Sequence, residues 1–230
     1  MPNPLFGLLT PNHQISIPTP LALGLGALGF VSLCSRINSY LSRKALNHGP
    51  STRTWDSKLE IVVVTGGSSG IGAAIVELLS DMGVKTIILD INEPQEKLKQ
   101  NTIFYQVDLS KPSQTSSVAA KLRAEHGDPT VLINNAGTEF NKPILELSES
   151  QLRGTFGVNI LAHFFLVQEF LPAMVSQNHG HVVSVASLGS FTTSAINVDY
   201  ACTKSAALAF YEGLGQELRH VYRAPGVRNS

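Results

Sequence analysis

Apolar residues change their spacing along this chain in a way that predicts alternating strands and helices. A continuous apolar run, Ile61 to Val64, suits a strand buried on both faces, and a glycine-rich turn follows it. Beyond the turn, apolar residues recur every three or four positions up to Met82, which predicts a helix, and Gly83 is placed to cap it. The alternation continues with strands at residues 85–90, 102–108, 130–137 and 180–187, and with helices at 112–126 and 198–220. A further helix is expected to begin at the capping box Ser148-x-x-Gln151 and to run towards Met174, with Pro172 disturbing its last turns.

Strands that alternate with helices predict a parallel sheet in a doubly wound, Rossmann-like α/β fold. In such folds ligands bind beyond the carboxyl ends of the strands. The glycine-rich turn and four polar residues follow strands at that end: Asp90, Asp108, Asn134 and Ser187.

The N-terminal part has a different character. Residues 1–50 contain no Asp or Glu, and a 14-residue uncharged apolar run, Leu21 to Cys34, is followed by Arg36, Arg43 and Lys44. The run is short for a bilayer-spanning helix, which needs about 20 apolar residues. No positive region precedes it, which disfavours a secretory signal. We expect membrane association, by spanning or by shallow insertion, with the following domain on the cytosolic side; a buried core helix or a disordered leader is the alternative.

Residues 47–56 are rich in turn formers and predict a linker. The expected organisation is therefore a hydrophobic anchor with linker at 1–50 and a dinucleotide-binding domain at 51–230.

Composition narrows the range of partners. The 17 basic residues balance 17 acidic ones, so nothing in the charge suggests nucleic acid or another polyanion, and a small or neutral substrate is expected. The two cysteines, Cys34 and Cys202, lie far apart, which fits a reducing compartment without a disulfide framework. No Cys/His spacing resembles a metal site.

The turn after the first strand reads Thr65-Gly66-x-x-x-Gly70-Ile71-Gly72. Gly66 permits the tight turn, Gly70 lets the backbone approach a pyrophosphate, and Gly72 lets helix and strand pack closely. The helix N-terminus then presents N–H groups to phosphate. Taken alone, the motif also fits a strand-to-helix turn without a ligand.

Asp90 ends the second strand, 18 residues after Gly72. An acid at this place can accept hydrogen bonds from the adenosine ribose hydroxyls and repels a 2′-phosphate, so it favours NAD over NADP. No Arg or Lys directly follows it. The alternative is a solvated Asp that opens a turn.

Tyr200 and Lys204 are four residues apart at the start of a predicted helix, so they share one face. A nearby cation lowers the pKa of a tyrosine from about 10 and makes it a usable proton donor or acceptor. Ser187 could hydrogen-bond a carbonyl or alkoxide oxygen beside that phenol. Such a pair alone is more often a surface pair; its place after a serine-bearing strand, in a chain with a dinucleotide loop, favours catalysis.

Together these motifs, with "NNAG" at Asn134 to Gly137 and Asn159 in "GVN", resemble the short-chain dehydrogenase/reductase family from about Leu59 onward. The resemblance implies that Tyr200 is the general acid/base, that Lys204 lowers its pKa and binds the nicotinamide ribose, and that Ser187 polarises the substrate oxygen. Asn159 would support a water-linked proton relay. NAD or NADP would be bound by Gly66, Ser68, Gly70, Ile71, Gly72, Asp90, Asp108, Asn134, Tyr200 and Lys204, and hydride would move between nicotinamide C4 and the substrate carbon.

The segments "ILDINEP", "VNILAHFF" and "VDYACTK" are similar to the membrane-associated branch of retinol and hydroxysteroid dehydrogenases. This resemblance implies a lipophilic substrate, with all-trans-retinal/retinol as the candidate and steroids or other lipids as alternatives. It also implies attachment to the endoplasmic reticulum or lipid droplets and is compatible with a homodimer. Some members use NADPH, so Asp90 gives a preference only.

Only 26 residues follow Lys204, whereas the family continues into a sixth strand, a Pro-Gly turn, a substrate-covering loop and a seventh strand. We therefore expect the sheet to be incomplete at its C-terminal edge, with the fifth strand as an open edge and Pro225-Gly226 in a loop that leads towards strand six. The chain by itself would then be poorly soluble or inactive. The alternatives to an active enzyme are an inactive fragment that binds dinucleotide at most, and a membrane-anchored binding protein.

Overall fold

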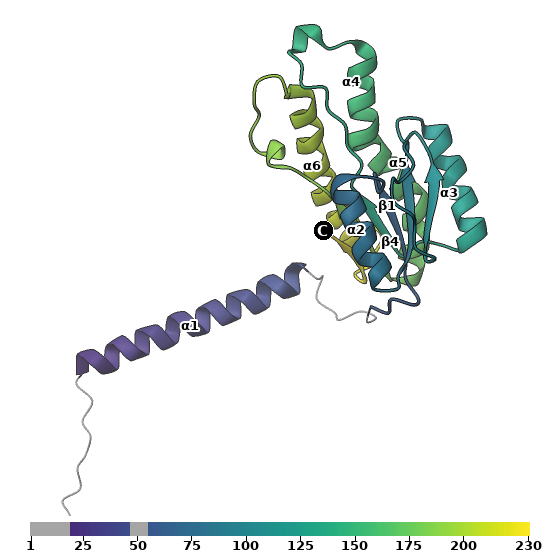
Figure 1. Cartoon of the computed structure of the whole chain (residues 1–230). Coiled ribbons are helices and arrows are strands. Elements are labelled where there is room, and N and C mark those ends of the chain that lie inside the picture. The colour runs from purple at the N-terminus through teal and green to yellow at the C-terminus, as the bar shows by residue number, and fades with distance from the viewer. Residues whose placement is uncertain (1–18, 47–54) are drawn as a thin grey trace, which may run out of the picture. The chain divides into compact units, whose positions relative to one another are not determined.

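The computed structural model describes residues 19–46 and 55–230, and the chain divides into two units, Met1–Leu46 and Asn47–Ser230 (Figure 1). In the first unit the described element is α1, a helix of 28 residues from Thr19 to Leu46. Its described side chains are all exposed. The predicted linker lies mostly outside the described residues, because its first eight positions, 47–54, are among those left out.

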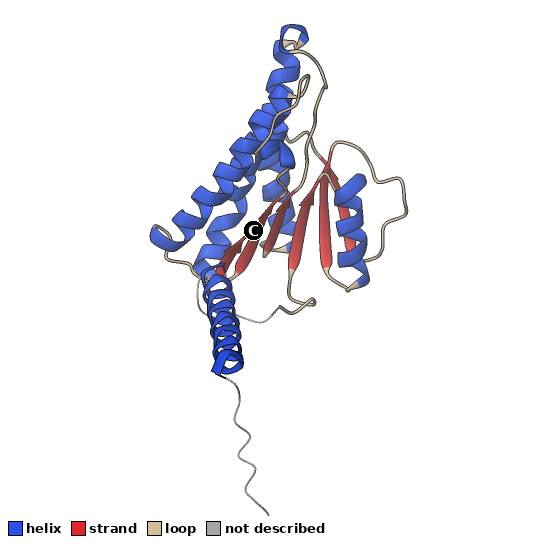
Figure 2. Ribbon diagram, turned by 90° about the vertical axis from the view of Figure 1, so that its left-hand side faces the viewer, coloured by secondary structure: helices blue, strands red, loops and turns tan. Residues whose placement is uncertain are grey.

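The second unit is built on a parallel six-stranded sheet with the order β3-β2-β1-β4-β5-β6 (Figure 2). The strands are β1 Ile61–Thr65, β2 Lys85–Asp90, β3 Thr102–Gln106, β4 Val131–Asn134, β5 Gly180–Ser184 and β6 Val227–Asn229. The order reverses between β1 and β4, which is the point where open α/β sheets bind ligands. This confirms the predicted doubly wound α/β fold.

Helices connect the strands: α2 Gly70–Asp81, α3 Pro112–His126, α4 Glu149–Phe156, α5 Ala162–Gln177 and α6 Val198–His220. The predicted capping box opens α4, since the Ser148 side chain accepts from the Gln151 N–H and the Gln151 side chain accepts from Ser148. The helix expected from there to Met174 is interrupted by one wide turn, Gly157–Leu161, of the π type. Pro172 does not end α5, which continues to Gln177.

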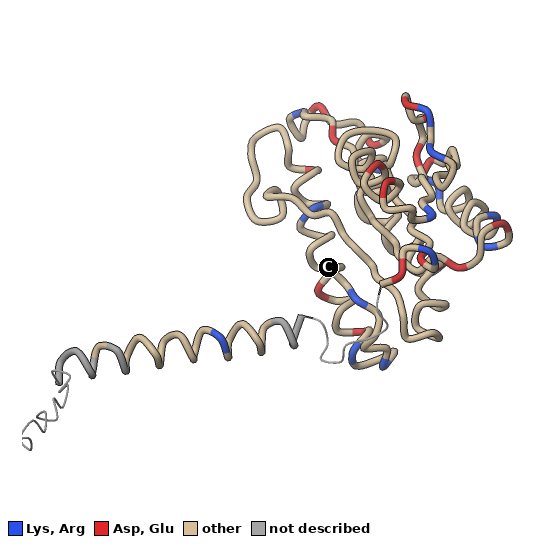
Figure 3. The backbone as a smooth tube through the Cα atoms, turned by 60° about the horizontal axis from the view of Figure 1, so that its bottom comes forward, with Lys and Arg blue, Asp and Glu red and all other residues tan. Residues whose placement is uncertain are grey.

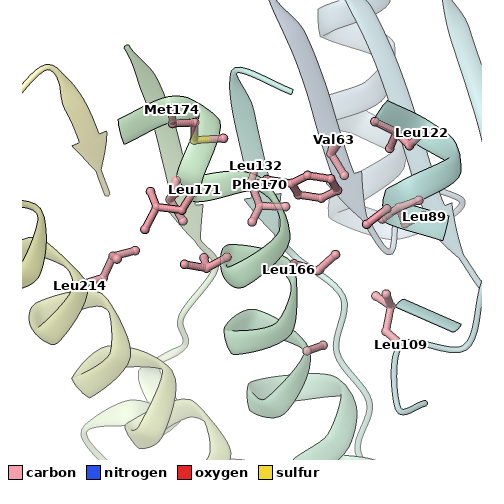
Figure 4. Close-up of a cluster of buried hydrophobic side chains, with 14 of the residues drawn as sticks. Val63, Leu89, Leu109, Leu122, Leu132, Leu166, Phe170, Leu171, Met174 and Leu214 are labelled. Atoms are coloured by element: carbon pink, nitrogen blue, oxygen red, sulfur yellow. The ribbon is translucent and has the colours of Figure 1, made fainter. Parts of the chain in front are cut away.

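Successive strand residues point to opposite faces of the sheet, so the central strands fill two cores. On one face Val63, Leu89 and Leu132 pack with side chains of α3, α5 and α6, including Leu122, Phe170 and Leu214 (Figure 4). On the other face Val62, Val64 and Ile88 pack with Val76 of α2. This double burial explains the uninterrupted apolar run of β1.

A sixth strand is present, contrary to our expectation of an open edge at β5. Val227–Asn229 pairs with β5 in parallel, with Gly180 opposite Val227 and Val182 opposite Asn229. The turn after α6 is shorter than expected, because Arg223 adopts a positive φ of 53° and the Ala224 N–H bonds back to the Leu218 carbonyl. Pro225-Gly226 lies in the loop that leads into this strand, as predicted.

Among the described residues, the stretch that is long and apolar enough to cross a membrane is Glu149–Gln177, and half of it is buried within the protein. This stretch is α4 and α5, so burial against the sheet accounts for its composition. Charged residues of both signs are interspersed over the second unit (Figure 3).

Candidate active site

The loops at the carboxyl ends of the strands surround a cavity of about 750 Å³. Of the residues predicted for the site, its lining includes Gly66, Ile71, Asp90, Asp108, Ser187, Tyr200 and Lys204. Ser68, Gly70, Gly72, Asn134 and Asn159 are not part of the lining. The structure thus brings the predicted catalytic serine, tyrosine and lysine to the same hollow as the predicted ribose-binding acid.

The glycine loop has the close contacts that its sequence implies. A Cβ at Gly72 would lie 2.0 Å from the Gly66 carbonyl oxygen, and a Cβ at Gly66 would lie 2.8 Å from the Ala136 Cα. Gly66 and Gly70 have positive φ values of 64° and 53°. The N-cap residue of α2, Ser69, makes no side-chain hydrogen bond to the first turn. A helix N-terminus of this kind, reached by a glycine turn, fits a dinucleotide pyrophosphate.

Asp90 ties the glycine loop to the loop after β2. Its Oδ2 accepts from the Ser68 N–H at 3.0 Å and its Oδ1 from the Asn92 N–H at 3.0 Å. The Ser68 hydroxyl donates to the Asn92 carbonyl at 2.7 Å. Each carboxylate oxygen has further lone pairs, so Asp90 can still accept from ribose hydroxyls in the cavity. Ser68 supports the site through Asp90 and does not line the cavity.

The two asparagines of "NNAG" point to different places. Asn134 is 1% exposed, and its side-chain atoms have no hydrogen-bond partner among the described residues. Asn135 lines the cavity instead, and its Nδ2 donates to the Thr65 carbonyl at 2.9 Å. Sequence reasoning missed Asn135; the alternation of side chains along β4, in which Ile133 and Asn134 face opposite ways, is the signal that separates it from Asn134.

Asp108 follows β3 and lines the cavity, and its Oδ1 accepts from both the N–H and the hydroxyl of Ser110, at 2.9 and 2.6 Å. These bonds fix the carboxylate at the mouth of the β3 loop. A fixed acceptor there fits the adenosine side of a dinucleotide, at the same edge of the sheet as Asp90.

Ser187 begins a single short turn, Leu188–Ser190, between β5 and α6. Its Oγ accepts from the Gly189 N–H at 3.0 Å, so the hydroxyl proton is available to another acceptor. Tyr200 lies in the first turn of α6 and lines the same cavity. A serine O–H and a tyrosine O–H at one wall suit a carbonyl or alkoxide oxygen.

Lys204 is 4% exposed, and its Nζ lies 5.7 Å from the centre of the Tyr200 ring. The ammonium group donates to the Val185 carbonyl at 2.7 Å. Burial lowers the pKa of Lys204 from its ordinary value. The structure therefore places a buried cation beside the ring of Tyr200, and both residues line the same cavity.

Asn159 lies in the wide turn between α4 and α5 and is fully buried. Its Oδ1 accepts from the Thr138 N–H at 2.8 Å, and its Nδ2 donates to the Thr138 carbonyl and to the Thr203 hydroxyl, both at 3.0 Å. Both side-chain donors are therefore used. The side chain joins the β4 loop to α6. Because its two N–H donors are used, a water in the expected proton relay would have to bind the main-chain carbonyl of Asn159. π-type turns are frequent at functional sites.

The family model described as short chain dehydrogenase matches residues 60–222. The chain belongs to this family. Dehydrogenase RED2 of Cochliobolus heterostrophus is 44% identical over 214 residues, which cover 92% of this chain and 77% of RED2. Estradiol 17-beta-dehydrogenase 11 of Mus musculus is 35% identical over 179 residues, covering 74% of this chain and 60% of that protein.

Solved structures agree with the family. The 4-hydroxyisoleucine dehydrogenase complexed with NADH has a TM-score of 0.66 at 25% identity, over 74% of this chain and 72% of that one. A metagenomic short-chain oxidoreductase in complex with NADP has a TM-score of 0.66 at 28% identity, over 74% and 78%. This short-chain dehydrogenase is therefore an oxidoreductase that acts on CH–OH donors with a nicotinamide dinucleotide. Of the two structures it resembles, one is a complex with NADH and the other a complex with NADP.

Proposed function

We propose that this oxidoreductase interconverts the alcohol and carbonyl forms of a lipophilic substrate and prefers NAD. The observation that carries the proposal is the convergence of Ser187, Tyr200 and Lys204 on the cavity that Asp90 also lines. All-trans-retinal/retinol is the candidate substrate. A steroid is the second candidate, supported by the likeness to estradiol 17-beta-dehydrogenase 11.

In this mechanism the protein places the substrate oxygen and handles its proton. Ser187 donates a hydrogen bond to that oxygen, and Tyr200 gives or takes the proton there. Lys204 stabilises the phenolate that forms when Tyr200 has given its proton. The nicotinamide supplies or accepts the hydride when it is bound. Asn159 holds the β4 loop against α6, the helix that carries Tyr200 and Lys204.

The lipophilic substrate class is supported by side chains beside the catalytic serine. Leu188 and Phe191, in the loop that Ser187 begins, are 82% and 76% exposed. Exposed large apolar side chains that follow a site residue in the chain favour a surface that meets an apolar ligand. Ile196, further along the same connection to α6, is 48% exposed. An apolar tail extending from the cavity would cover these side chains.

Membrane attachment through α1 completes the proposal. Leu28, Phe30 and Val31 are 64% exposed or more, and they lie in the acid-free part of the chain. An exposed apolar segment followed by basic residues within the same helix suits insertion with the catalytic unit on the cytosolic side, at the endoplasmic reticulum or lipid droplets. Because the match to RED2 leaves out only 8% of this chain, it includes most of α1.

A homodimer is the assembly we propose, with α4 and α5 as the contact. Leu152, Phe156 and Phe164 expose apolar surface along these helices. Exposed large apolar side chains on neighbouring helices favour an interface between protein copies. Light scattering of residues 55–230 and of the full chain in detergent tests it: a monomer at all concentrations contradicts it.

The test of function is turnover by the full chain in detergent or liposomes. We expect oxidation of NADH with all-trans-retinal or with a steroid ketone, and slower oxidation of NADPH. Asp90→Ala should narrow the difference between the two cofactors, because it removes the carboxylate that repels a 2′-phosphate. Binding of NADH without turnover of either carbonyl would contradict the proposal and favour a binding protein.

A further inference from the structure

The short turn Leu188–Ser190, which begins at Ser187, is bound to α6 by its last residue. The Ser190 hydroxyl donates to the Lys204 carbonyl at 2.8 Å, and the Ser205 hydroxyl donates to the Ser190 carbonyl at 3.0 Å. Lys204 and Ser205 are consecutive residues of α6, so the side chain and the main chain of Ser190 are bound at the same point of this helix. One half-buried serine thus joins the loop after β5 to α6.

The same hydroxyl group also binds Ser187. Its oxygen accepts from the Ser187 N–H at 3.4 Å, and the Ser190 N–H donates to the Ser187 carbonyl at 3.0 Å. A hydroxyl group has one donor hydrogen and two acceptor lone pairs, so it can bind the Ser187 N–H and the Lys204 carbonyl at once. Ser190 therefore bridges the main chains of two residues whose side chains line the cavity.

The turn also lies beside the ring of Tyr200. A Cβ at Gly189 would lie 3.4 Å from both the Ser187 Oγ and the Tyr200 Cε1, so the Gly189 backbone occupies the space next to these two side chains. The Gly189 N–H donates to the Ser187 Oγ at 3.0 Å. The place of this turn on α6 thus decides how the Ser187 hydroxyl lies relative to the Tyr200 ring.

Other links between the turn and α6 hold this spacing less firmly. Residues 191–196, which continue the chain from the turn towards α6, are all exposed. The Lys204 Nζ binds the Val185 carbonyl, but it does so through a long side chain that the proposed mechanism itself uses. A serine side chain has far less rotamer freedom than a lysine side chain, so the Ser190 bridge is the more rigid of the two links.

We propose that Ser190 is a positioning residue, which bridges the main chains of Ser187 and Lys204 and so sets the spacing between the Ser187 hydroxyl and the Tyr200 phenol. This inference rests on the proposed function, in which both groups bind one substrate oxygen. They reach that oxygen together only when the turn and α6 keep their spacing, and a misplacement of about 1 Å can lower a rate by about 10²-fold. Removing the Ser190 hydroxyl loosens the bridge without changing either reacting side chain.

Turnover by Ser190→Ala and Ser190→Thr in the full chain tests this role. The probe is cyclohexanone with saturating NADH, because a small ketone gives a readout that does not depend on the lipophilic substrate. We expect the kcat of Ser190→Ala to fall by about tenfold, while the KM for cyclohexanone and the affinity for NADH change by less than about twofold. Ser190→Thr keeps a hydroxyl group and should restore kcat.

Hydrogen exchange in the turn gives a second readout, which needs no substrate. In Ser190→Ala the Ser187 N–H loses its acceptor, so the amides of Ser187 and Gly189 should exchange about fivefold faster, as for the loss of one net hydrogen bond. Ser176→Ala is the matched control. The exposed Ser176 hydroxyl also donates to a main-chain carbonyl, that of Ala173 at 2.9 Å, but within α5. This variant should leave kcat and the exchange of the turn unchanged.

Unchanged kcat in Ser190→Ala, no restoration by Ser190→Thr, or an equal loss in Ser176→Ala overturns the proposal. If circular dichroism shows that Ser190→Ala does not fold, Ser205→Ala removes the other bond to the turn and should lower kcat less, in the same direction; unchanged kcat there also overturns it. A chain that reduces cyclohexanone but neither retinal nor a steroid ketone contradicts only the proposed substrate. If no carbonyl is reduced, the proposed function fails, and equal exchange in Ser190→Ala and the unsubstituted chain still overturns the bridge.

Discussion

The Lys204 ammonium group lies 5.7 Å from the centre of the Tyr200 ring, one turn further along α6, with both side chains on the wall of one cavity. Replacing Tyr200 by Phe keeps the ring and removes the phenol hydroxyl, which in the proposed mechanism exchanges a proton with the substrate. We expect turnover to fall by at least about 10²-fold, since positioned proton transfer contributes about 10²–10⁴-fold. Steady-state NADH oxidation measures the loss.

The control for Tyr200→Phe is NADH binding by fluorescence, which should remain within a few-fold of the unsubstituted chain. Full activity of the variant would remove Tyr200 from the mechanism. Loss of NADH binding together with turnover would show a damaged fold instead.

Gly72→Ala should distort the glycine loop, because the added Cβ would lie 2.0 Å from the Gly66 carbonyl oxygen and 2.6 Å from Asn135 Nδ2. We expect a loss of about 1–3 kcal/mol in the free energy of unfolding, as for overpacking, together with weaker dinucleotide binding. Urea unfolding monitored by circular dichroism measures the first.

Gly213→Ala is the matched control for this substitution. Gly213 lies inside α6 with nothing within 4 Å of its added Cβ, so alanine should stabilise the helix by about 0.5–1 kcal/mol. If both alanines have the same effect, the close approach at Gly72 is not what limits that position.

Acid should destabilise the domain through His163. Its folded pKa is about 4 and its ordinary value is 6.5, so between these values the unfolded chain binds the proton and the folded chain does not. Stability is therefore lost as the pH falls from about 6.5 to 4, by about 3 kcal/mol if the shift is fully realised. His126 and His181, whose pKa values are also lowered mainly by burial, act in the same direction.

Thermal unfolding between pH 7 and pH 4.5 measures this loss, and His163→Asn should make it shallower. His220→Asn, at an exposed position at the end of α6, is the control and should leave the slope unchanged. The same slope in all three chains would contradict the assignment.

Periodicity was sufficient for the elements that pack by a repeating pattern. The predicted helices at residues 112–126 and 198–220 and the strand at 85–90 have the same bounds in the structure. Three other strands end earlier than predicted, because their last residues leave the sheet to form the site. Val185 to Ser187, for example, follow β5. They contribute the carbonyl that binds Lys204 and the Ser187 side chain that lines the cavity.

Other features depend on contacts that a single sequence does not encode in its pattern. The wide turn at Gly157–Leu161 adds less than one residue to the helical repeat, so the apolar spacing conceals it. Asn134 and Asn135 have the same side chain. The alternation of side chains along β4 decides which of the two reaches the cavity. The left-handed conformation of Arg223 shortens the turn after α6, so that enough residues remain to form the sixth strand.

Gly226→Ala tests that sixth strand. An added Cβ would lie 2.0 Å from the Asn178 carbonyl oxygen, and the Gly226 N–H would lose its bond to Asn178 Oδ1, now 2.8 Å long. We expect β6 to detach from β5, which breaks the bonds from the Ser184 N–H to the Ser230 carbonyl and from the Ser230 N–H to the Val182 carbonyl. Hydrogen exchange at Ser184 should then become faster, and the chain should aggregate more readily, because a bare parallel edge is a template for pairing.

Arg228→Ala, at an exposed position within β6, is the matched control and should exchange like the unsubstituted chain. Unchanged exchange at Ser184 in Gly226→Ala would mean that β6 does not protect this edge. Protection that is lost only in Gly226→Ala would instead tie the order of the sixth strand to the segment that carries Ser187.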